Sequence, residues 1–320
     1  MWRPCRYCRV FPALFILFLS CGPKPGPGGE SRPVATPLGL VLETIIEGPI
    51  LSRSLSQPKG VWCDNTGAVY VVDAGNNRII RFSRDLQALR DVGGFGVAEG
   101  LLKWPTYITV DKNLNLYVSE EGNQRISVFD TRLNFGYLID LVDPEEPLKY
   151  GRPAGIAVND YGEILVADRD NSRIAVFNSF SNFDRFIGGI ESSAGRLLKP
   201  AGICLLPDNT VLACDQSNAR IEVFDAFGIY ESSFGSDYLN EPSGLAVDDH
   251  GNIWVVDRNP AALLCFDPAG NALYAAESGR DAAFDRLEEP FDLAALPGSR
   301  LILTDLAGDR LLVYNILYQD

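Results

Sequence analysis

The residues of this sequence best suited to chemistry form a six-residue motif that occurs four times. Each copy has an acid, an Asn three positions later and an Arg two positions after that, as in DAGNNR at 73–78. The motif residues are Asp73, Asn76, Arg78, Glu120, Asn123, Arg125, Asp168, Asn171, Arg173, Asp215, Asn218 and Arg220. An Arg can pair bidentately with a carboxylate, and an Asn can occupy a tight turn because it bonds nearby backbone and tolerates the left-handed conformation. One active site does not need four copies, so the motif predicts a β-hairpin stabilised by contact between the acid and the Arg, and it predicts no catalytic residue.

Few other residues offer the groups that hydrolytic or metal-dependent catalysis requires. The chain has one histidine, His250, so it cannot build a multi-histidine metal site, and no Ser–His–Asp or Cys–His arrangement has its base. His250 belongs to the turn-like stretch DDHG, so we expect it to be exposed to solvent. Aspartates are abundant, but predicted turns and hairpins account for them. We therefore expect no cofactor and no metal site, and a carboxylate-bound Ca²⁺ is left open.

The N-terminal residues have a different composition from the rest. Three arginines precede the apolar run Val10–Leu19, which is too short to span a bilayer and is typical of a secretory signal peptide over residues 1–20. The sequence FLSC that ends at Cys21 resembles the lipobox of bacterial lipoproteins, in which the cysteine is lipidated and becomes the mature N-terminus. Residues 21–37 are rich in Pro and Gly and predict a tether. Ordinary secretion with cleavage nearby, or a retained leader, is the alternative.

The charge of the chain excludes one class of partner. The formal net charge is −14, and loss of the leader would leave 25 basic against 42 acidic residues. Such a surface repels the phosphate backbone of nucleic acids, so we expect no nucleic-acid binding. It also disfavours adhesion to anionic lipid, so any membrane contact would come from a lipid anchor.

From Pro58 onward the sequence is periodic. Six units begin with a proline, at 58, 105, 153, 200, 242 and 290, and the spacing between them is 42 to 48 residues. Each unit has an apolar run, an Asp/Asn/Gly-rich turn, a second apolar run that ends at the acid and a third that starts at the Arg. We therefore predict an all-β, six-bladed β-propeller over residues 38–320 with four-stranded antiparallel blades. The repeated motif becomes the hairpin between the second and third strands of a blade.

The last unit ends too early to supply its own outer strand. The apolar run Leu38–Ile46 precedes the first unit and is otherwise unassigned. We predict that this N-terminal strand completes blade 6 and closes the ring, because an uncovered edge would invite aggregation.

Four cysteines fall within the repeats, at 63, 204, 214 and 265, and their spacing does not suggest zinc. A two-residue turn at Asn65-Thr66, carried over to blade 4, places Cys204 opposite Val211 and Cys214 opposite Ala201. The two sulfurs then point to opposite faces of the sheet. We therefore predict four free, buried thiols.

The repeat resembles the NHL repeat, through its start P-x-G-[IV] and its end V-x-D-x-x-N-x-R-I. The resemblance extends from Pro58 to the C-terminal end, and blades 1, 3 and 4 match best. The departures are Tyr107 and Glu120 in blade 2, Pro260 and Ala262 in blade 5, and Phe291, Asp292 and Gly308 in blade 6. NHL proteins form six-bladed propellers, so the resemblance implies the blade number that the repeat count predicts.

Propellers usually bind ligands at one end of their channel, where the hairpins and the loops before the prolines emerge. The residues that differ most between units at this end are Lys59, Glu121, Arg169, Gln216 and Arg258. We predict that they contact a ligand; the alternative is that they are a solvated rim.

Two functions follow from these observations. The first is a lipid-anchored, extracytoplasmic binding or scaffolding module for a protein, peptide or glycan, exported to the bacterial cell envelope. The second is an extracytoplasmic metal-dependent lyase or lactonase, because several enzymes share the propeller architecture. The scarcity of histidine favours the first, and we do not expect an enzyme.

Overall fold

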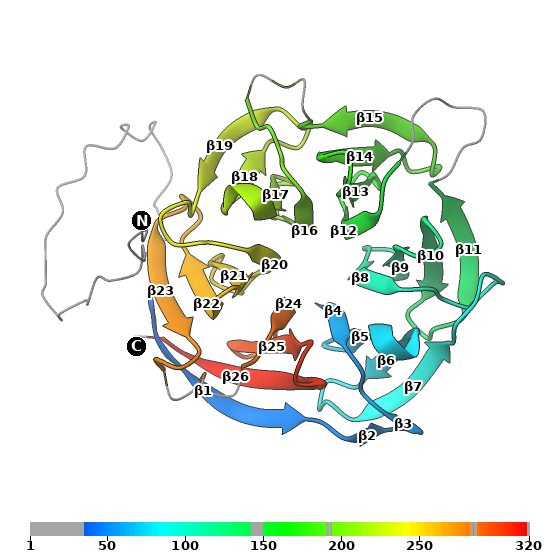
Figure 1. Cartoon of the computed structure of the whole chain (residues 1–320), viewed down its shortest axis with the longest axis horizontal. Coiled ribbons are helices and arrows are strands. Elements are labelled where there is room, and N and C mark those ends of the chain that lie inside the picture. Colours follow the sequence, from blue (N-terminus) through cyan, green and yellow to red (C-terminus); the bar gives the residue numbers. More distant parts are fainter. Residues whose placement is uncertain are drawn as a thin grey trace, which may run out of the picture. The chain divides into compact units, whose positions relative to one another are not determined.

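A computed structural model describes residues 35–141, 150–189, 192, 194–281, 284 and 287–318. Its main elements are six four-stranded antiparallel sheets around a common axis, one for each sequence unit (Figure 1). The predicted all-β, six-bladed propeller is confirmed. The predicted signal peptide, the lipidation site Cys21 and the tether up to residue 34 lie outside the described residues.

Each blade runs from strand a at the axis to strand d at the periphery. Strands a are β4 (Pro58–Cys63), β8 (Pro105–Val110), β12 (Pro153–Val158), β16 (Pro200–Leu205), β20 (Pro242–Val247) and β24 (Pro290–Leu296). Strands b are β5 (Val69–Asp73), β9 (Asn115–Glu120), β13 (Ile164–Asp168), β17 (Val211–Asp215), β21 (Ile253–Arg258) and β25 (Arg300–Asp305). Strands c are β6 (Arg78–Phe82), β10 (Arg125–Asp130), β14 (Arg173–Phe177), β18 (Arg220–Phe224), β22 (Ala261–Phe266) and β26 (Arg310–Tyr318). Strands d are β7 (Ala88–Gly93), β11 (Phe135–Asp140), β15 (Phe183–Ile187), β19 (Tyr230–Phe234), β23 (Ala272–Glu277) and β1 (Pro37–Ile46).

Four short elements lie outside this scheme. β2 (Pro49–Ile50) and β3 (Arg53–Ser54) form a small hairpin in the loop that leads to β4, and η1 (Ala74–Asn76) and η2 (Gln216–Asn218) are single 3₁₀ turns. Both 3₁₀ turns follow the acid of the repeated motif, in blades 1 and 4.

The inner strands are apolar on both faces because each blade packs between two neighbours. In β5 every residue is buried. Val69 and Val71 pack with residues of blade 6, whereas Tyr70 and Val72 pack with residues of blade 2. The two-residue period of a strand therefore sends alternate side chains into two separate cores. This is why the sequence shows continuous apolar runs instead of alternation.

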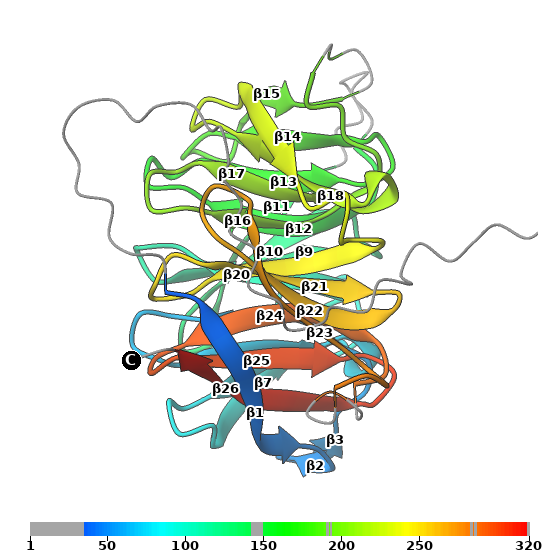
Figure 2. The ribbon, with the colours of Figure 1, turned by 90° about the vertical axis from the view of Figure 1, so that its left-hand side faces the viewer.

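The N-terminal strand closes the ring as predicted. β1 pairs antiparallel with β26, from Pro37 opposite Tyr318 to Ile46 opposite Leu311 (Figure 2). Leu40 of β1 is buried in the same core as Leu312 of β26. The last blade therefore takes its three inner strands from the C-terminal end of the chain and its outer strand from the N-terminal side, which covers the edge of β26.

The repeated motif forms the hairpin between strands b and c, as predicted. Arg78 Nε donates to Asp73 Oδ2 at 2.7 Å, and the distance is 2.8 Å in blade 2, 3.0 Å in blade 3 and 3.6 Å in blade 4. The amide of Asn76 donates both to Asp73, at 2.9 Å, and to the carbonyl of Ser54. The left-handed residue of the turn is the residue after this Asn, Asn77, with φ 52°. The Asn must instead point back toward the acid to bond it.

The acid has a further role that its spacing did not reveal. In each blade it accepts a hydrogen bond from a backbone N–H in the loop that leads to strand a. The donors are Ser56, Lys103, Gly151, Leu198, Asn240 and Glu288, each 17 residues before its acid. This bond does not need the Asn or the Arg. It explains why Asp257 is retained in blade 5, where Pro260 and Ala262 replace them: its carboxylate also accepts from the backbone of Glu241 and Asn259.

The cysteines are free as predicted, but the reason given for one pair is wrong. Cys204, Cys214 and Cys265 are buried and Cys63 is partly buried, and all four are free. Strands a and b of blade 4 start in the expected register, but an irregularity shifts it, so that Cys204 lies opposite Leu212. The shift places Cys204 and Cys214 in the same hydrophobic core instead of on opposite faces.

Candidate functional site at the hairpin end of the channel

The six strands a surround the axis so closely that side chains are excluded at four equivalent positions. The third residue of strand a is glycine in blades 1, 3, 4 and 5. A Cβ added to Gly155 would lie 2.2 Å from the carbonyl oxygen of Ala201 in the next blade, and one added to Gly202 would lie 2.5 Å from that of Ser243. Glycine is therefore required by the close approach of neighbouring backbones.

The two remaining equivalent positions carry Tyr107 and Asp292, which were noted above only as departures from the repeat. The hydroxyl of Tyr107, in blade 2, donates to the carbonyl oxygen of Ser243 in blade 5 at 2.9 Å. The Tyr107 ring also lies 5.1 Å from the ring of Phe291 in blade 6. The Tyr107 side chain is 4% exposed. It thus bonds across the axis and links three blades, and only a cavity of about 20 Å³ lies beside it.

Asp292 is a buried carboxyl at the same level. It is 6% exposed and accepts a hydrogen bond from the backbone N–H of Val61 at 3.1 Å. Burial raises the pKa of the Asp292 carboxyl to about 8, although hydrogen bonds from the backbone of Val61 and Leu293 oppose the rise. At neutral pH the group is mostly protonated.

We call the end of the channel that carries the six b–c hairpins and the loops before strands a the hairpin end. The five predicted ligand contacts all lie here, one from each of blades 1 to 5, and none of them is fully exposed. Arg169 Nη2 donates to Gln216 Oε1 at 2.6 Å. Arg258 forms an ion pair with Glu289, the residue before strand a of blade 6.

One aromatic ring brings two of these cations together. Lys59 Nζ lies 5.6 Å and Arg258 Cζ 5.5 Å from the centre of the Phe291 ring. Burial lowers the pKa of the Lys59 ammonium, the carboxylate of Glu121 opposes this, and Arg258 and Arg169 add to it. The five side chains are therefore connected by hydrogen bonding or by charge, and Lys59 and Arg258 lie over Phe291. We call this group, with Glu289, the mouth cluster.

Sequence reasoning located the mouth cluster but missed the aromatic and acidic residues beneath it. Tyr107, Phe291 and Asp292 were recognised as departures from the repeat but were given no role. The available signal was their position, because each replaces a small residue at the innermost strand. A side chain that replaces glycine at the axis must fill the channel or reach across it.

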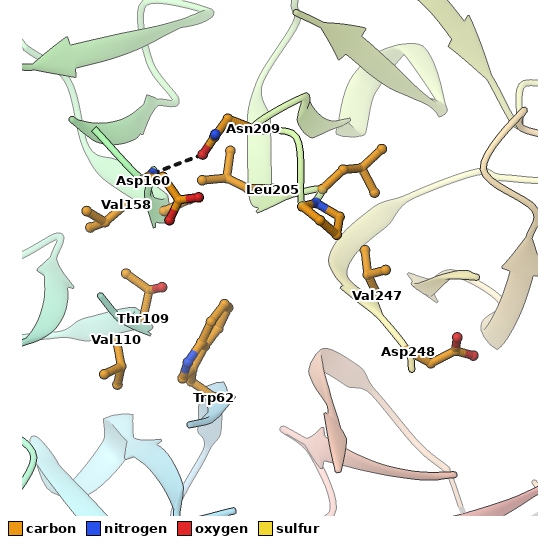
Figure 3. A pocket seen from close by; sticks show the side chains of 12 residues that line it. Trp62, Thr109, Val110, Val158, Asp160, Leu205, Asn209, Val247 and Asp248 are labelled. Atoms are coloured by element: carbon orange, nitrogen blue, oxygen red, sulfur yellow. Dashed lines mark hydrogen bonds between the residues drawn. The ribbon is translucent and has the colours of Figure 1, made fainter. Parts of the chain in front are cut away.

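We call the opposite end, which carries the a–b turns, the turn end. A cavity of about 370 Å³ opens here, lined by side chains that include Trp62, Val110, Leu205 and Val247 (Figure 3). At its edge the Asn209 side chain accepts a hydrogen bond from the backbone N–H of Asp160. His250 is exposed at this end, as predicted, with its ring 4.2 Å from that of Tyr318.

The described residues lack two further features. They contain no group of three or more His, Cys, Asp or Glu side chains placed to hold a metal ion. They also contain no helix long and apolar enough to cross a membrane.

Comparison with known proteins agrees with the repeat analysis. A model of the NHL repeat matches residues 150–177 and 239–266, which are parts of blades 3 and 5. Two blades of this propeller are NHL repeats. The blade 5 match differs from the expectation that blades 1, 3 and 4 match best, and it occurs although blade 5 lacks the Asn and Arg of the hairpin motif.

The NHL-repeat chain has both curated relatives and structural neighbours. It is 34% identical over 76 residues to human NHL repeat-containing protein 3, which covers 23% of this chain and 22% of that one. The chain spans between 13% and 37% of the curated relatives that it matches. A streptogramin B lyase superposes with a TM-score of 0.62 at 17% identity, covering 88% of each chain. A gluconolactonase from Xanthomonas campestris superposes with a TM-score of 0.63 at 15% identity, covering 89% of this chain and 99% of that one. These two likenesses show the fold alone.

Proposed function

We propose that this NHL-repeat propeller is a binding or scaffolding module whose hairpin end takes a protein, peptide or glycan ligand. The observation that carries the proposal is the mouth cluster: five polar side chains from five blades are partly or fully buried at one end of the channel, and two of them, Lys59 and Arg258, lie over the ring of Phe291. Keeping cations this close to each other and away from water is unfavourable, and burial already lowers the pKa of Lys59. Such an arrangement is typical of a recognition site and is unlike a solvated rim.

The proposal includes export and anchoring at the bacterial cell envelope, on the periplasmic or the outer surface. Its support is in the sequence: the apolar run Val10–Leu19, the cysteine Cys21 that follows it and the Pro/Gly-rich stretch after that. If Cys21 carries the lipid, Cys21→Ser should release the protein from the membrane fraction or block its maturation. Unchanged fractionation and mass of the variant would contradict the anchor.

The binding site can be tested with a photo-crosslinking amino acid placed at either end of the channel. At position 121, in the mouth cluster, it should give an adduct with an envelope component, and the adduct should disappear when Arg169→Ala is added. At position 249, an exposed residue of the turn end, it should give none. Equal adducts at both positions, or an adduct indifferent to Arg169→Ala, would contradict a hairpin-end site.

The second candidate, a metal-dependent lyase or lactonase, is favoured by the likeness of the fold to a streptogramin B lyase and a gluconolactonase. Carboxylate-held Ca²⁺ would be the metal to test first. Hydrolysis of simple lactones by purified protein, abolished by a chelator and restored by Ca²⁺, would favour this candidate over a binding module.

A further inference from the structure

The mouth cluster contains buried hydrogen-bond donors that have no acceptor. Gln216 is 5% exposed, its Oε1 accepts from Arg169, and its buried Nε2 has no partner among the described residues. Arg258 uses Nη2 for Glu289, but its buried Nε also has no partner there. Buried donors are nearly always bonded in proteins, so two unbonded donors at one site indicate that something else supplies the acceptors.

The charges of the mouth cluster indicate the same kind of ligand. Lys59, Arg169 and Arg258 are cations, and Glu121 and Glu289 are anions, so the cluster has one positive charge in excess. Lys59 forms no ion pair with any carboxylate of the described residues within 4.0 Å. The groups left to bond are an ammonium, an amide N–H and a guanidinium N–H, which are all donors.

A carboxylate meets both requirements. It carries one negative charge and only acceptor oxygens. A phosphate monoester carries nearly two negative charges. It matches the single excess positive charge of the cluster less well, and the chain as a whole, with a net charge of −14, repels it more strongly. A glycan hydroxyl has no charge to offer and brings donors of its own.

The residue after the hairpin acid is apolar in two of the six blades. The residue after the hairpin acid is Arg169, Gln216 and Arg258 in blades 3, 4 and 5, but Ala74 in blade 1 and Leu306 in blade 6. Ala74 is buried and Leu306 partly buried. A ligand that presents its charge to Lys59, Gln216 and Arg258 can therefore also contact the apolar side chain of Leu306.

We propose that the mouth cluster recognises a peptide carboxylate whose neighbouring side chain is apolar. The Gln216 amide, Arg258 Nε and the Lys59 ammonium bond its oxygens, and the partly buried Leu306 contacts its apolar group. This rests on the proposed binding function and names the chemistry of the ligand.

Two small probes test it on the purified chain. N-acetylphenylalanine has the carboxylate and the ring, whereas N-acetylphenylalanine amide has the same shape without the charge. At pH 7 we expect the acid to bind at least tenfold more tightly than the amide. The chain has five glutamines, so selective ¹⁵N labelling gives five pairs of side-chain amide signals. The acid should move that of Gln216 downfield, and the neutral amide should not.

Variants distinguish this site from weak general attraction. Lys59→Met and Gln216→Met should each lower affinity for the acid about fivefold or more and leave that for the amide unchanged. Lys112→Met removes an exposed lysine at the turn end and should change neither. Equal binding of acid and amide, no binding of either, or full affinity in a folded Lys59→Met variant would overturn the carboxylate proposal. None of these results would contradict the proposed binding function itself, because the crosslinking experiment tests that function separately.

Discussion

Replacing Asp292 by Asn should stabilise the protein at neutral and alkaline pH, and the gain should grow with pH. Asp292 lies at the axis and is 6% exposed, so its charged form is poorly solvated. Burial raises its pKa from the ordinary value of 3.8 to about 8 in the folded protein. Between these two values the folded chain holds one proton more than the unfolded chain. Wild-type stability therefore has a contribution that is complete below about pH 4 and is lost as the pH rises to about 8.

The size of the effect follows from the pKa difference. Each unit of pKa difference corresponds to about 1.4 kcal/mol. The interval from 3.8 to about 8 then gives about 5 to 6 kcal/mol as an order-of-magnitude limit. Asn cannot ionise, so Asp292→Asn escapes this loss. The Asn amide has a hydrogen-bonding cost of its own, but that cost does not depend on pH, so the change with pH is the quantity to measure.

The assay is urea denaturation of wild type and variant at half-unit steps from pH 4.5 to pH 9. We expect the stability of the variant relative to wild type to rise by several kcal/mol between pH 4.5 and pH 8 and then level off. Asp237→Asn changes an exposed carboxyl and should give a curve parallel to that of wild type. Parallel curves for Asp292→Asn as well would refute the assignment of Asp292 as a neutral buried acid.

Three further predictions concern the scaffold. Arg78→Ala should destabilise the protein by about 3 to 5 kcal/mol, because it leaves the buried carboxylate of Asp73 without its ion-pair partner. Arg152→Ala breaks an exposed ion pair of similar length and should cost under about 1 kcal/mol. Denaturant melts of the two compare them, and equal costs would contradict the role of burial. Deleting residues 22–34 should leave the melting temperature unchanged. Deleting residues 22–46 should lower the melting temperature or cause aggregation, because β1 then no longer covers the edge of β26. Thermal melting and light scattering of the two deletion variants test this prediction. Burial raises the pKa values of the thiols of Cys204, to about 12, and of Cys214 and Cys265, so these three buried thiols should react with Ellman's reagent at pH 8 only after denaturation. Cys63 is partly buried and can react earlier, so rapid labelling of more than one of these four thiols in native protein would be inconsistent with the fold.

Several features could be predicted because they depend on local sequence. The proline spacing and the short apolar runs gave the number of blades, since each blade repeats the same local structure. The acid and Arg of the motif were placed correctly at the hairpin because they lie five residues apart, within reach of one tight turn. The closing strand Leu38–Ile46 was found by elimination, because one edge lacked a partner and one apolar run lacked a place.

The candidate site could be predicted only in part. The mouth residues Lys59 and Arg258 were found because the repeats align, so variable positions at equivalent places fall on one end of the ring. Gln216 was found in the same way, but its unbonded amide depends on the position of Arg169 in the next blade.

Other features were decided only by the tertiary structure. The hydrogen bond from Tyr107 to Ser243 joins residues 136 positions apart, and no local pattern encodes it. The register of Cys204 depends on an irregularity near the start of strand a, which recurs in all six blades and which the hairpin turn alone did not reveal. The protonation of Asp292 depends on how completely six strands exclude water from the axis. The sequence determined which residues recur in each blade, and ring closure decided which of them meet, because only the closed ring brings residues of distant blades within contact distance.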